Sequence, residues 1–165
     1  MRRAITIAAL LLTATLAACG FQLRGAYNLP FKTLHTGLPD AQELHALIKR
    51  SVEAGSNTLV VNDIKDAEAQ LRVLDNRQEK RVLSTSASGQ AREYELIRVF
   101  GFQLVNKDNR ALLPPSQIVL KRDITYSDSV VLSKESEEQL LWRDMQNDLV
   151  QQLLRRLSTA RLREE

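Results

Sequence analysis

Two changes in the spacing of apolar residues constrain the fold of this chain more than any other feature of its sequence. Apolar residues recur every three or four positions from Ala41 to Val52, and the same spacing returns from Ser133 onward. Between these segments, much of residues 59–126 alternates apolar and polar. Helical spacing buries one stripe of a helix, whereas alternation buries one face of a strand. The pattern therefore predicts a helix, then several strands, and then a second helix.

The C-terminal segment carries the strongest helical signal. Acidic residues stand near its start, and Arg155 and Arg156 stand near its end. Both placements interact favourably with the helix dipole. One apolar row runs along it, namely Leu141, Met145, Leu149, Leu153 and Leu157. We expect this row to pack on the rest of the domain.

The first helical segment has start and stop signals of its own. Asp40 can cap the helix, and Glu43 three residues later completes a pair that resembles a capping box. Gly55 is placed to end the helix in a left-handed conformation.

The strands between the helices are consecutive in sequence, which favours hairpins. Residues 84–90 are small and polar and end in Gly-Gln, so they predict a hairpin tip. Pro114 and Pro115 are expected to stop strand pairing. The order of elements predicts an α+β fold: a two-layer sandwich of a mostly antiparallel four-stranded sheet with two helices packed on one face.

The N-terminus has the features of a secretory signal. Met1-Arg2-Arg3 is basic, and the uncharged apolar run 4–18 is shorter than the about 20 residues that span a bilayer. Leu16-Ala17-Ala18 directly precedes Cys19, the only cysteine of the chain. This Leu-Ala-Ala-Cys sequence resembles the bacterial lipobox.

The lipobox resemblance implies cleavage before Cys19, diacylation of its sulfur with chains such as palmitate, and acylation of the new amine. Gly20, in place of the Asp that retains bacterial lipoproteins at the inner membrane, favours the outer membrane. An ordinary signal peptide with a chance cysteine is the alternative. The expected organisation is a removed signal peptide (1–18), a lipid-anchored tether (19–33), one α+β domain (34–158) and a C-terminal tail (159–165).

Charge and composition exclude several functional classes. Removal of the first 18 residues leaves 21 Lys+Arg against 20 Asp+Glu, and no basic cluster accompanies stacking aromatics, so we expect no nucleic-acid partner. The single cysteine excludes a four-cysteine zinc site, and His35 and His45 lack metal-ligand spacing; we expect one in a strand or loop and the other on a helix surface. No nucleophile elbow or phosphate loop is present, which argues for a binding or structural protein rather than an enzyme.

Four segments together carry a family resemblance. They are Leu-Ala-Ala-Cys-Gly-Phe-Gln-Leu-Arg-Gly at 16–25, Ala-Arg-Glu-Tyr-Glu-Leu at 91–96, Arg-Asp-Ile-Thr-Tyr-Ser-Asp at 122–128, and Val-Leu-Ser-Lys-Glu-Ser-Glu at 131–137, which leads into the helical segment 145–157. In this order and spacing they resemble the LPS-assembly lipoprotein family, LptE, along nearly the whole chain.

The resemblance implies a non-enzymatic outer-membrane lipoprotein that faces the periplasm or lies within a barrel lumen. Its implied partners are lipopolysaccharide, the membrane that holds its lipid anchor, and the LPS-assembly β-barrel LptD in a 1:1 complex. There it would act as plug and assembly partner while lipopolysaccharide is delivered to the outer leaflet. It implies no catalytic residue, metal or cofactor beyond the acyl chains on Cys19.

Candidate contact residues follow from the resemblance. Lys134 matches a basic family position implicated in lipopolysaccharide contact, with an ordinary surface lysine as the alternative. Members of the family can carry a basic residue in the hairpin, where this chain has small residues. Arg92, Arg81 and Lys80 lie close by in sequence and could supply the lipopolysaccharide contact instead. The alternative for each is an ordinary solvated charge on a strand. Arg122 and Tyr126 match a family pattern and are expected to be structural. The candidates for partner contact form the hairpin tip: Ser86, Ala87, Ser88 and Gly89.

Two other functional classes remain open. One is a periplasm-facing transport-auxiliary or inhibitor lipoprotein without a barrel partner. The other is an outer-membrane-anchored hydrolase, for which the sequence shows no catalytic group.

Overall fold

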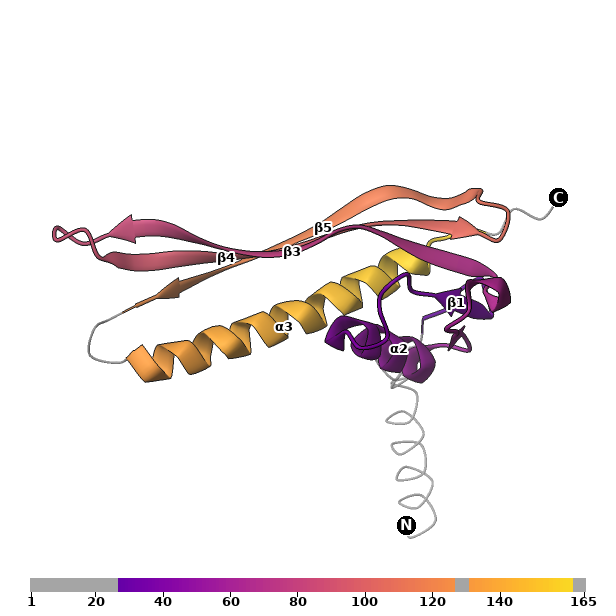
Figure 1. Ribbon diagram of the computed structural model, residues 1–165, viewed down its shortest axis with the longest axis horizontal. Helices are drawn as coiled ribbons and strands as arrows, with labels where there is room; N and C mark the ends of the chain where they lie inside the picture. The colour runs from indigo at the N-terminus through magenta and orange to yellow at the C-terminus, as the bar shows by residue number, and fades with distance from the viewer. Residues whose placement is uncertain (1–26, 127–130, 162–165) are drawn as a thin grey trace, which may run out of the picture.

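The computed structural model describes residues 27–126 and 131–161 of the chain (Figure 1). Its elements in chain order are β1 (Thr33–His35), α2 (Glu43–Gly55), β2 (Leu59–Val60), the short 3-10 helix η1 (Ile64–Asp66), β3 (Ala69–Thr85), β4 (Ala91–Asn106), β5 (Ala111–Thr125) and α3 (Val131–Leu157). The strands form one sheet in the order β2-β1-β3-β4-β5. Both helices lie on one face of it. The predicted α+β sandwich is confirmed.

The sheet has five strands rather than the expected four. β1 pairs in parallel with β2 on one side and with β3 on the other. β3, β4 and β5 pair antiparallel as a meander. The apolar segment Leu59-Val60-Val61 predicts a short strand, and its first two residues form β2, so the expected count of four was one strand too few.

The molecule is elongated, with two unlike ends (Figure 1). At the broad end, β1, β2, α2 and η1 gather around the start of β3. At the hairpin end, the β3–β4 turn projects beyond the first residues of α3. The described C-terminal end of α3 returns to the broad end, so this helix lies along most of the sheet.

A β-bulge at Leu74 decides which side chains of β3 face the helices. Val73 pairs with Phe102 and Asp75 with Gly101, so β3 has one more residue than β4 at this point. Because side chains alternate along a strand, one extra residue exchanges the two faces. Before the bulge, Leu71 and Val73 lie on the helix-covered face; beyond it, Gln78 and Lys80 do.

The core lies between α3, α2 and the middle of the sheet. Phe100 and Phe102 of β4 are fully buried, with ring centroids 6.1 Å apart. The predicted apolar row of α3 is buried from Met145 to Leu157. Leu29 and Phe31, which precede β1, are buried in the same core.

The open face of the sheet is covered by its own charged side chains. Ile97 and Val99 of β4 are each only 4% exposed although they point away from the helices. Arg77 lies 3.4 Å from Asp75 and 3.2 Å from Glu79. The stems of such long side chains can cover apolar neighbours while their charged ends stay in water.

Both expected end signals of the first helix were wrong. The residue that begins α2 is capped by Gln42 without a side-chain hydrogen bond, and Asp40 instead lies 3.6 Å from His45 Nε2. Gly55 is the last helical residue and has no left-handed φ. The Ser56 hydroxyl satisfies the helix end by donating to the Val52 carbonyl at 2.7 Å.

Two further expectations are corrected by tertiary contacts. Pro114 and Pro115 lie inside β5, where the register shifts between Leu113 and Ser116. β5 is an edge strand, and an edge tolerates proline because one side needs no N–H donor. His45 is buried rather than on the surface, and its Nδ1 lies 2.8 Å from the Thr36 hydroxyl.

We predict that Gly37→Ala destabilises the fold by about 2 kcal/mol or more. Gly37 has a φ of +63°, and an added Cβ would lie 2.5 Å from the Leu71 carbonyl oxygen. The left-handed conformation alone costs a non-glycine residue about 1–2 kcal/mol. Urea unfolding measures the loss.

Gly89→Ala is the matched control for Gly37→Ala. Gly89 also has a positive φ, +81°, but an added Cβ there meets nothing within 4 Å. Equal losses of stability in the two variants would show that the Leu71 contact does not matter.

Candidate functional site

The tip of the β3–β4 hairpin is held by its own short-range hydrogen bonds. The Ser86 N–H donates to the Gln90 carbonyl at 2.7 Å, and the Gly89 N–H donates to the Ser86 carbonyl at 2.9 Å. The Ser86 and Ser88 hydroxyls lie 2.8 Å apart. Ala87, Ser88 and Gly89 are exposed. The predicted tip is confirmed as a small, polar protrusion.

Lys80 is held beneath the start of α3 by what we call the Lys80 cluster (Lys80, Tyr94, Tyr126, Glu138 and Trp142). Its Nζ donates to Glu138 Oε2 at 2.6 Å and lies 4.3 Å and 4.7 Å from the ring centroids of Tyr94 and Tyr126. The Tyr126 hydroxyl donates to the same carboxylate at 2.5 Å, and Trp142 Nε1 donates to Glu138 Oε1 at 3.3 Å. An ammonium over aromatic faces and paired with a carboxylate ties α3 to the sheet.

The Lys80 cluster shifts the pKa values of its members toward the charged pair. Burial alone would raise the pKa of Glu138, but hydrogen bonds from Lys80, Tyr126 and Trp142 outweigh it and hold this pKa below its ordinary value. Burial alone would lower the pKa of Lys80, but its bonds to Glu138 and Tyr126 raise this pKa above its ordinary value. Burial and the bond to Glu138 raise the pKa of the Tyr126 hydroxyl. At neutral pH both members of the ion pair are therefore charged.

We predict that Glu138→Gln lowers the free energy of unfolding by about 1–3 kcal/mol at pH 7, since it removes a hydrogen-bonded charge. A carboxyl whose pKa is lowered by folding stabilises the protein above its unfolded pKa, and this contribution disappears as pH falls through the folded pKa. The gap between wild type and variant should therefore shrink below about pH 4.5.

Urea unfolding at pH 7 and pH 3 measures this gap. Glu135→Gln, at an exposed position of the same helix, is the control and should change stability little at either pH. A gap for Glu138→Gln that stays constant between the two pH values would contradict the linkage.

Lys134 lies at the hairpin end, in the first turns of α3. Its Nζ donates to Glu137 Oε2 at 2.7 Å, and its side chain is 22% exposed. It stands four residues before Glu138, which places it one helical turn from the Lys80 cluster. The structure therefore brings Lys134 and Lys80 to the same end of the molecule as the hairpin tip.

The other two basic candidates have different surroundings. Arg81 lies on the open face, and its Nη2 donates to Glu79 Oε2 at 2.7 Å. Arg92 is partly buried near the tip, where its carbonyl accepts from the Tyr126 N–H at 2.8 Å. Cys19, the expected lipid attachment site, lies outside the described residues.

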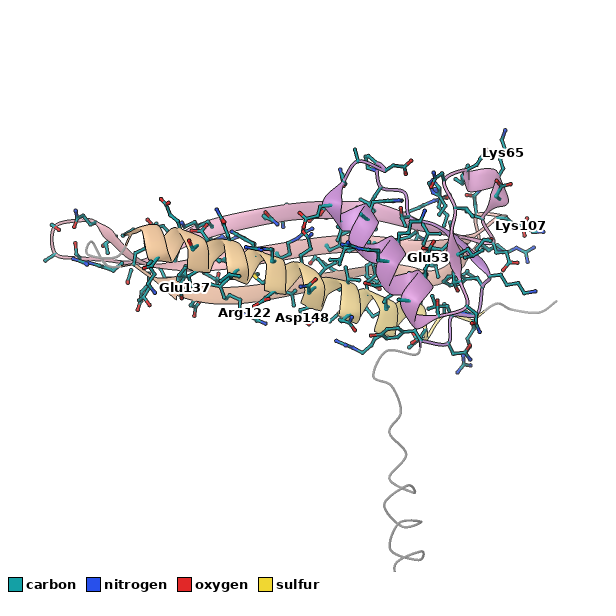
Figure 2. The ribbon with its side chains drawn as sticks, turned by 90° about the horizontal axis from the view of Figure 1, so that it is seen from below. Glu53, Lys65, Lys107, Arg122, Glu137 and Asp148 are labelled. Atoms are coloured by element: carbon teal, nitrogen blue, oxygen red, sulfur yellow. The ribbon has the colours of Figure 1, made fainter. Side chains whose placement is uncertain are left out.

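Arg122 and Tyr126 have the structural roles expected of them. Arg122 of β5 lies 3.6 Å from Asp148 of α3, and Figure 2 shows the two side chains side by side along the helix. Tyr126 belongs to the Lys80 cluster. Glu138 and Trp142 complete that cluster. Both were missed as site residues, because an acidic residue near a helix start is typical of a solvated face and Trp142 has the spacing of the apolar row of α3.

Arg98 is a buried cation that stands in β4 between the buried apolar residues Leu96 and Phe100. It is 3% exposed and lines a hollow of about 340 Å³ with Gln78 and Gln146. Its Nη1 donates to the Arg77 and Val99 carbonyls, and its Nη2 donates to Asn76 Oδ1. Its Nε finds no partner in the described part of the chain. Burial lowers its pKa, and the charge of Asp75 opposes this.

Two absences in the described part of the chain bear on function. Within residues 27–126 and 131–161, no three or more His, Cys, Asp or Glu side chains are grouped so that they could hold a metal ion. No helix in that part of the chain combines the length and the apolar character needed to cross a bilayer.

Comparison with known proteins places this fold among envelope lipoproteins. The model of the family described as "LptE: Lipopolysaccharide-assembly" matches residues 31–157. An LPS-assembly lipoprotein LptE of Pectobacterium atrosepticum is 26% identical over 147 residues, which cover 87% of this chain and 78% of the relative. An LPS-assembly lipoprotein LptE of Yersinia pestis is 27% identical over 154 residues, which cover 87% of this chain and 70% of the relative.

Solved structures agree with these matches. A lipoprotein B of Nitrosomonas europaea superposes with a TM-score of 0.72 at 35% identity and covers 84% of this chain and 90% of its own. A minor lipoprotein of Acinetobacter baumannii superposes with a TM-score of 0.64 at 26% identity, and the match covers 79% of this chain and 92% of the other.

Proposed function

The chain belongs to the LptE family of lipopolysaccharide-assembly lipoproteins, and from this membership we propose that it is an outer-membrane lipoprotein that binds lipopolysaccharide and both plugs and helps to assemble the β-barrel LptD. The complex is 1:1 and delivers lipopolysaccharide to the outer leaflet. The protein is not an enzyme and takes no cofactor beyond the acyl chains on Cys19. The family consists of envelope lipoproteins that take part in lipopolysaccharide assembly. The barrel partner, the plug role and the binding of lipopolysaccharide by this chain are what we propose.

The observation that carries the plug proposal is the elongated shape of the sheet. β3, β4 and β5 have 17, 16 and 15 residues, so this part of the sheet is roughly 50 Å long. Its open face carries a ladder of charged side chains on β3, with Val119 of β5 as an exposed apolar residue beside it. The lumen of a large outer-membrane barrel is polar, so a long, charge-covered rod suits it.

The hairpin end supports the ligand proposal. Lipopolysaccharide carries phosphates and acyl chains, and Lys or Arg side chains recognise phosphates. Lys134 is the leading contact because it matches the family's basic position and its ion-pair partner, Glu137, is itself exposed at the hairpin end of the molecule. Arg92 and Arg81 flank the hairpin tip in sequence, whereas Lys80 is paired with the largely buried Glu138 and serves first to hold α3.

The test of the barrel proposal is a detergent pull-down of the tagged mature protein from its own outer membrane, followed by mass spectrometry. One large β-barrel at equal stoichiometry is the expected result. Charge placed on the tip, as in Ser86→Glu with Ser88→Glu, should lower this recovery if Ser86–Gly89 contact the barrel. Recovery of the lipoprotein alone would favour the second candidate, a periplasm-facing auxiliary or inhibitor lipoprotein without a barrel.

We predict that Lys134→Gln weakens binding of the purified protein to lipopolysaccharide about fivefold, the effect of one cation near an anionic lipid surface. Arg143→Gln removes the same charge from an exposed position further along α3 and is the matched control. Equal affinities of both variants, with thermal midpoints unchanged, would remove Lys134 from the binding surface.

A further inference from the structure

The broad end of the molecule carries a basic hollow that no proposal above uses. It has a volume of about 500 Å³ and is lined by Lys65, Arg72 and Lys107 together with the amides Gln70, Asn106 and Asn109. Figure 2 shows Lys65 and Lys107 at the end of the molecule opposite to the hairpin. The three cations come from three separate elements: η1, β3 and the β4–β5 turn.

The alternation of β3 places Arg72 on the open face. Ala69 and Leu71 are buried in the core, so Gln70 and Arg72 point to the other side of the sheet. η1 then carries Lys65 to the rim of the hollow. The Asp63 carboxylate fixes this short helix by accepting from the Lys65 backbone N–H at 2.9 Å.

Neutral oxygens orient Arg72 without compensating its charge. Its Nε donates to Gln70 Oε1 at 3.2 Å, and its Nη2 donates to Asn109 Oδ1. Asn109 has a left-handed φ of 61°, and Asn106 Oδ1 braces the turn by accepting from the Asp108 and Arg110 N–H groups. The turn therefore holds the guanidinium in a set direction, and a charged fork is left for an external anion.

No carboxylate lines the hollow. Asp63 and Asp66 are neighbours of Lys65 in sequence, and Asp108 follows Lys107, but in the described part of the chain none of the three cations forms an ion pair. Three unpaired cations around one hollow attract a multiply charged oxyanion, and a phosphate group matches both the Arg fork and the lysine ammonium groups.

The hollow lies near the start of the described chain. The Thr33 hydroxyl donates to the Asp66 carbonyl and accepts from the Glu68 N–H, which joins the η1 segment to the beginning of β1. Cys19 stands 14 residues before Thr33, so a lipid anchor there keeps the hollow within about 50 Å of the membrane surface at full extension. Ile64, which is half exposed, adds an apolar contact at the rim.

We propose that this basic hollow binds a phosphate group carried by a membrane lipid. The proposal rests on the lipid-anchor part of the proposed function but not on the barrel. The phosphate can belong to an anionic phospholipid or to lipopolysaccharide, and these two sources are separated by experiment.

The test is vesicle co-flotation of the mature chain carrying Cys19→Ser, so that no acyl anchor masks the contact. One set of phosphatidylcholine vesicles contains phosphatidylglycerol and a second set contains lipopolysaccharide. The triple variant Lys65→Gln, Arg72→Gln, Lys107→Gln is compared with a matched triple on the helices, Arg50→Gln, Arg143→Gln, Arg155→Gln, which removes the same charge from exposed positions.

Each basic residue near an anionic surface contributes a factor of roughly five, so the hollow triple should bind about 100-fold more weakly while the helix triple changes little. Loss with phosphatidylglycerol vesicles identifies a phospholipid, and loss with lipopolysaccharide vesicles identifies the lipopolysaccharide phosphate. Equal loss in both triples, or no loss in either vesicle set, overturns the proposal.

Two checks keep the outcome interpretable. The double variant Lys65→Gln, Lys107→Gln removes no hydrogen bond of the Arg72 side chain and should fold as wild type, yet it should still bind about 25-fold more weakly. The detergent pull-down separates this proposal from the plug proposal. The hollow triple should still recover the barrel although it binds vesicles weakly. A wild-type protein that binds vesicles but recovers no barrel would remove the plug proposal alone.

Discussion

A mature chain with Cys19→Ser, exported behind a cleavable secretory signal, should move from the membrane fraction into the soluble periplasmic fraction. Each buried methylene of an acyl chain contributes about 0.8 kcal/mol to membrane attachment, and stable anchoring takes more than one chain. Loss of all chains on Cys19 should therefore change the protein from almost wholly membrane-bound to mostly soluble. Fractionation and intact-mass measurement of the two forms check this.

The design of the Cys19 experiment guards against two other ways of staying on the membrane. The cleavable signal prevents an unprocessed apolar segment from acting as an anchor. Expression in excess over the barrel leaves a surplus that no protein partner can retain. A wild-type mass without acyl increments, or a serine variant that stays in the membrane fraction under these conditions, would rule out lipidation at Cys19.

Phe100→Ala should destabilise the fold by about 3–5 kcal/mol, the cost of emptying a fully buried aromatic site. Phe100 lies in the stretch of β4 that is buried on both faces, stacks on Phe102 and belongs to the core that α3 and α2 cover. Rigid strands on both sides limit how far this site can collapse. For a chain of this size the loss corresponds to a fall of roughly 10–15 °C in the thermal midpoint.

Leu140→Ala is the control for Phe100→Ala. Leu140 lies on α3 but is 54% exposed, so its truncation should change stability by less than about 0.5 kcal/mol. Thermal and urea unfolding of both variants in the non-acylated mature chain measures the contrast. A loss below about 1 kcal/mol for Phe100→Ala would mean that the core repacks around the missing ring.

The elements with the longest regular spacing were predicted well from sequence. The apolar row of α3 and the alternation of β4 are local patterns that extend over several turns or pleats, and each has one structural solution. The short segment Leu59–Val61 was also predicted as a strand, and its first two residues form β2; only the total of four strands was one too few. The ends of α2 were also missed, since Asp40 and Gly55 resemble capping residues while His45 and Ser56 make the contacts that the folded chain uses.

The candidate site also has parts that the sequence predicts and parts that depend on tertiary contacts. The protruding tip at Ser86–Gly89 followed from composition alone, and Lys134 was placed by a family resemblance. The pairing of Lys80 with Glu138 joins residues 58 positions apart and could not be inferred from spacing on either element.

Sequence alone therefore determined the predicted processing site at Cys19, the order of helical and alternating segments, and the chemistry available at the hairpin tip. Tertiary structure decided which charges meet. The bulge at Leu74 exchanges the faces of β3, which sends Lys80 under α3 and leaves Arg81 on the open face. The β4–β5 turn places Asn109 against Arg72 and Lys107 on the same hollow, because β4 pairs with β3 along its whole length. Periodicity is a local property of one segment, whereas strand register and the convergence of side chains depend on partners that are distant in sequence.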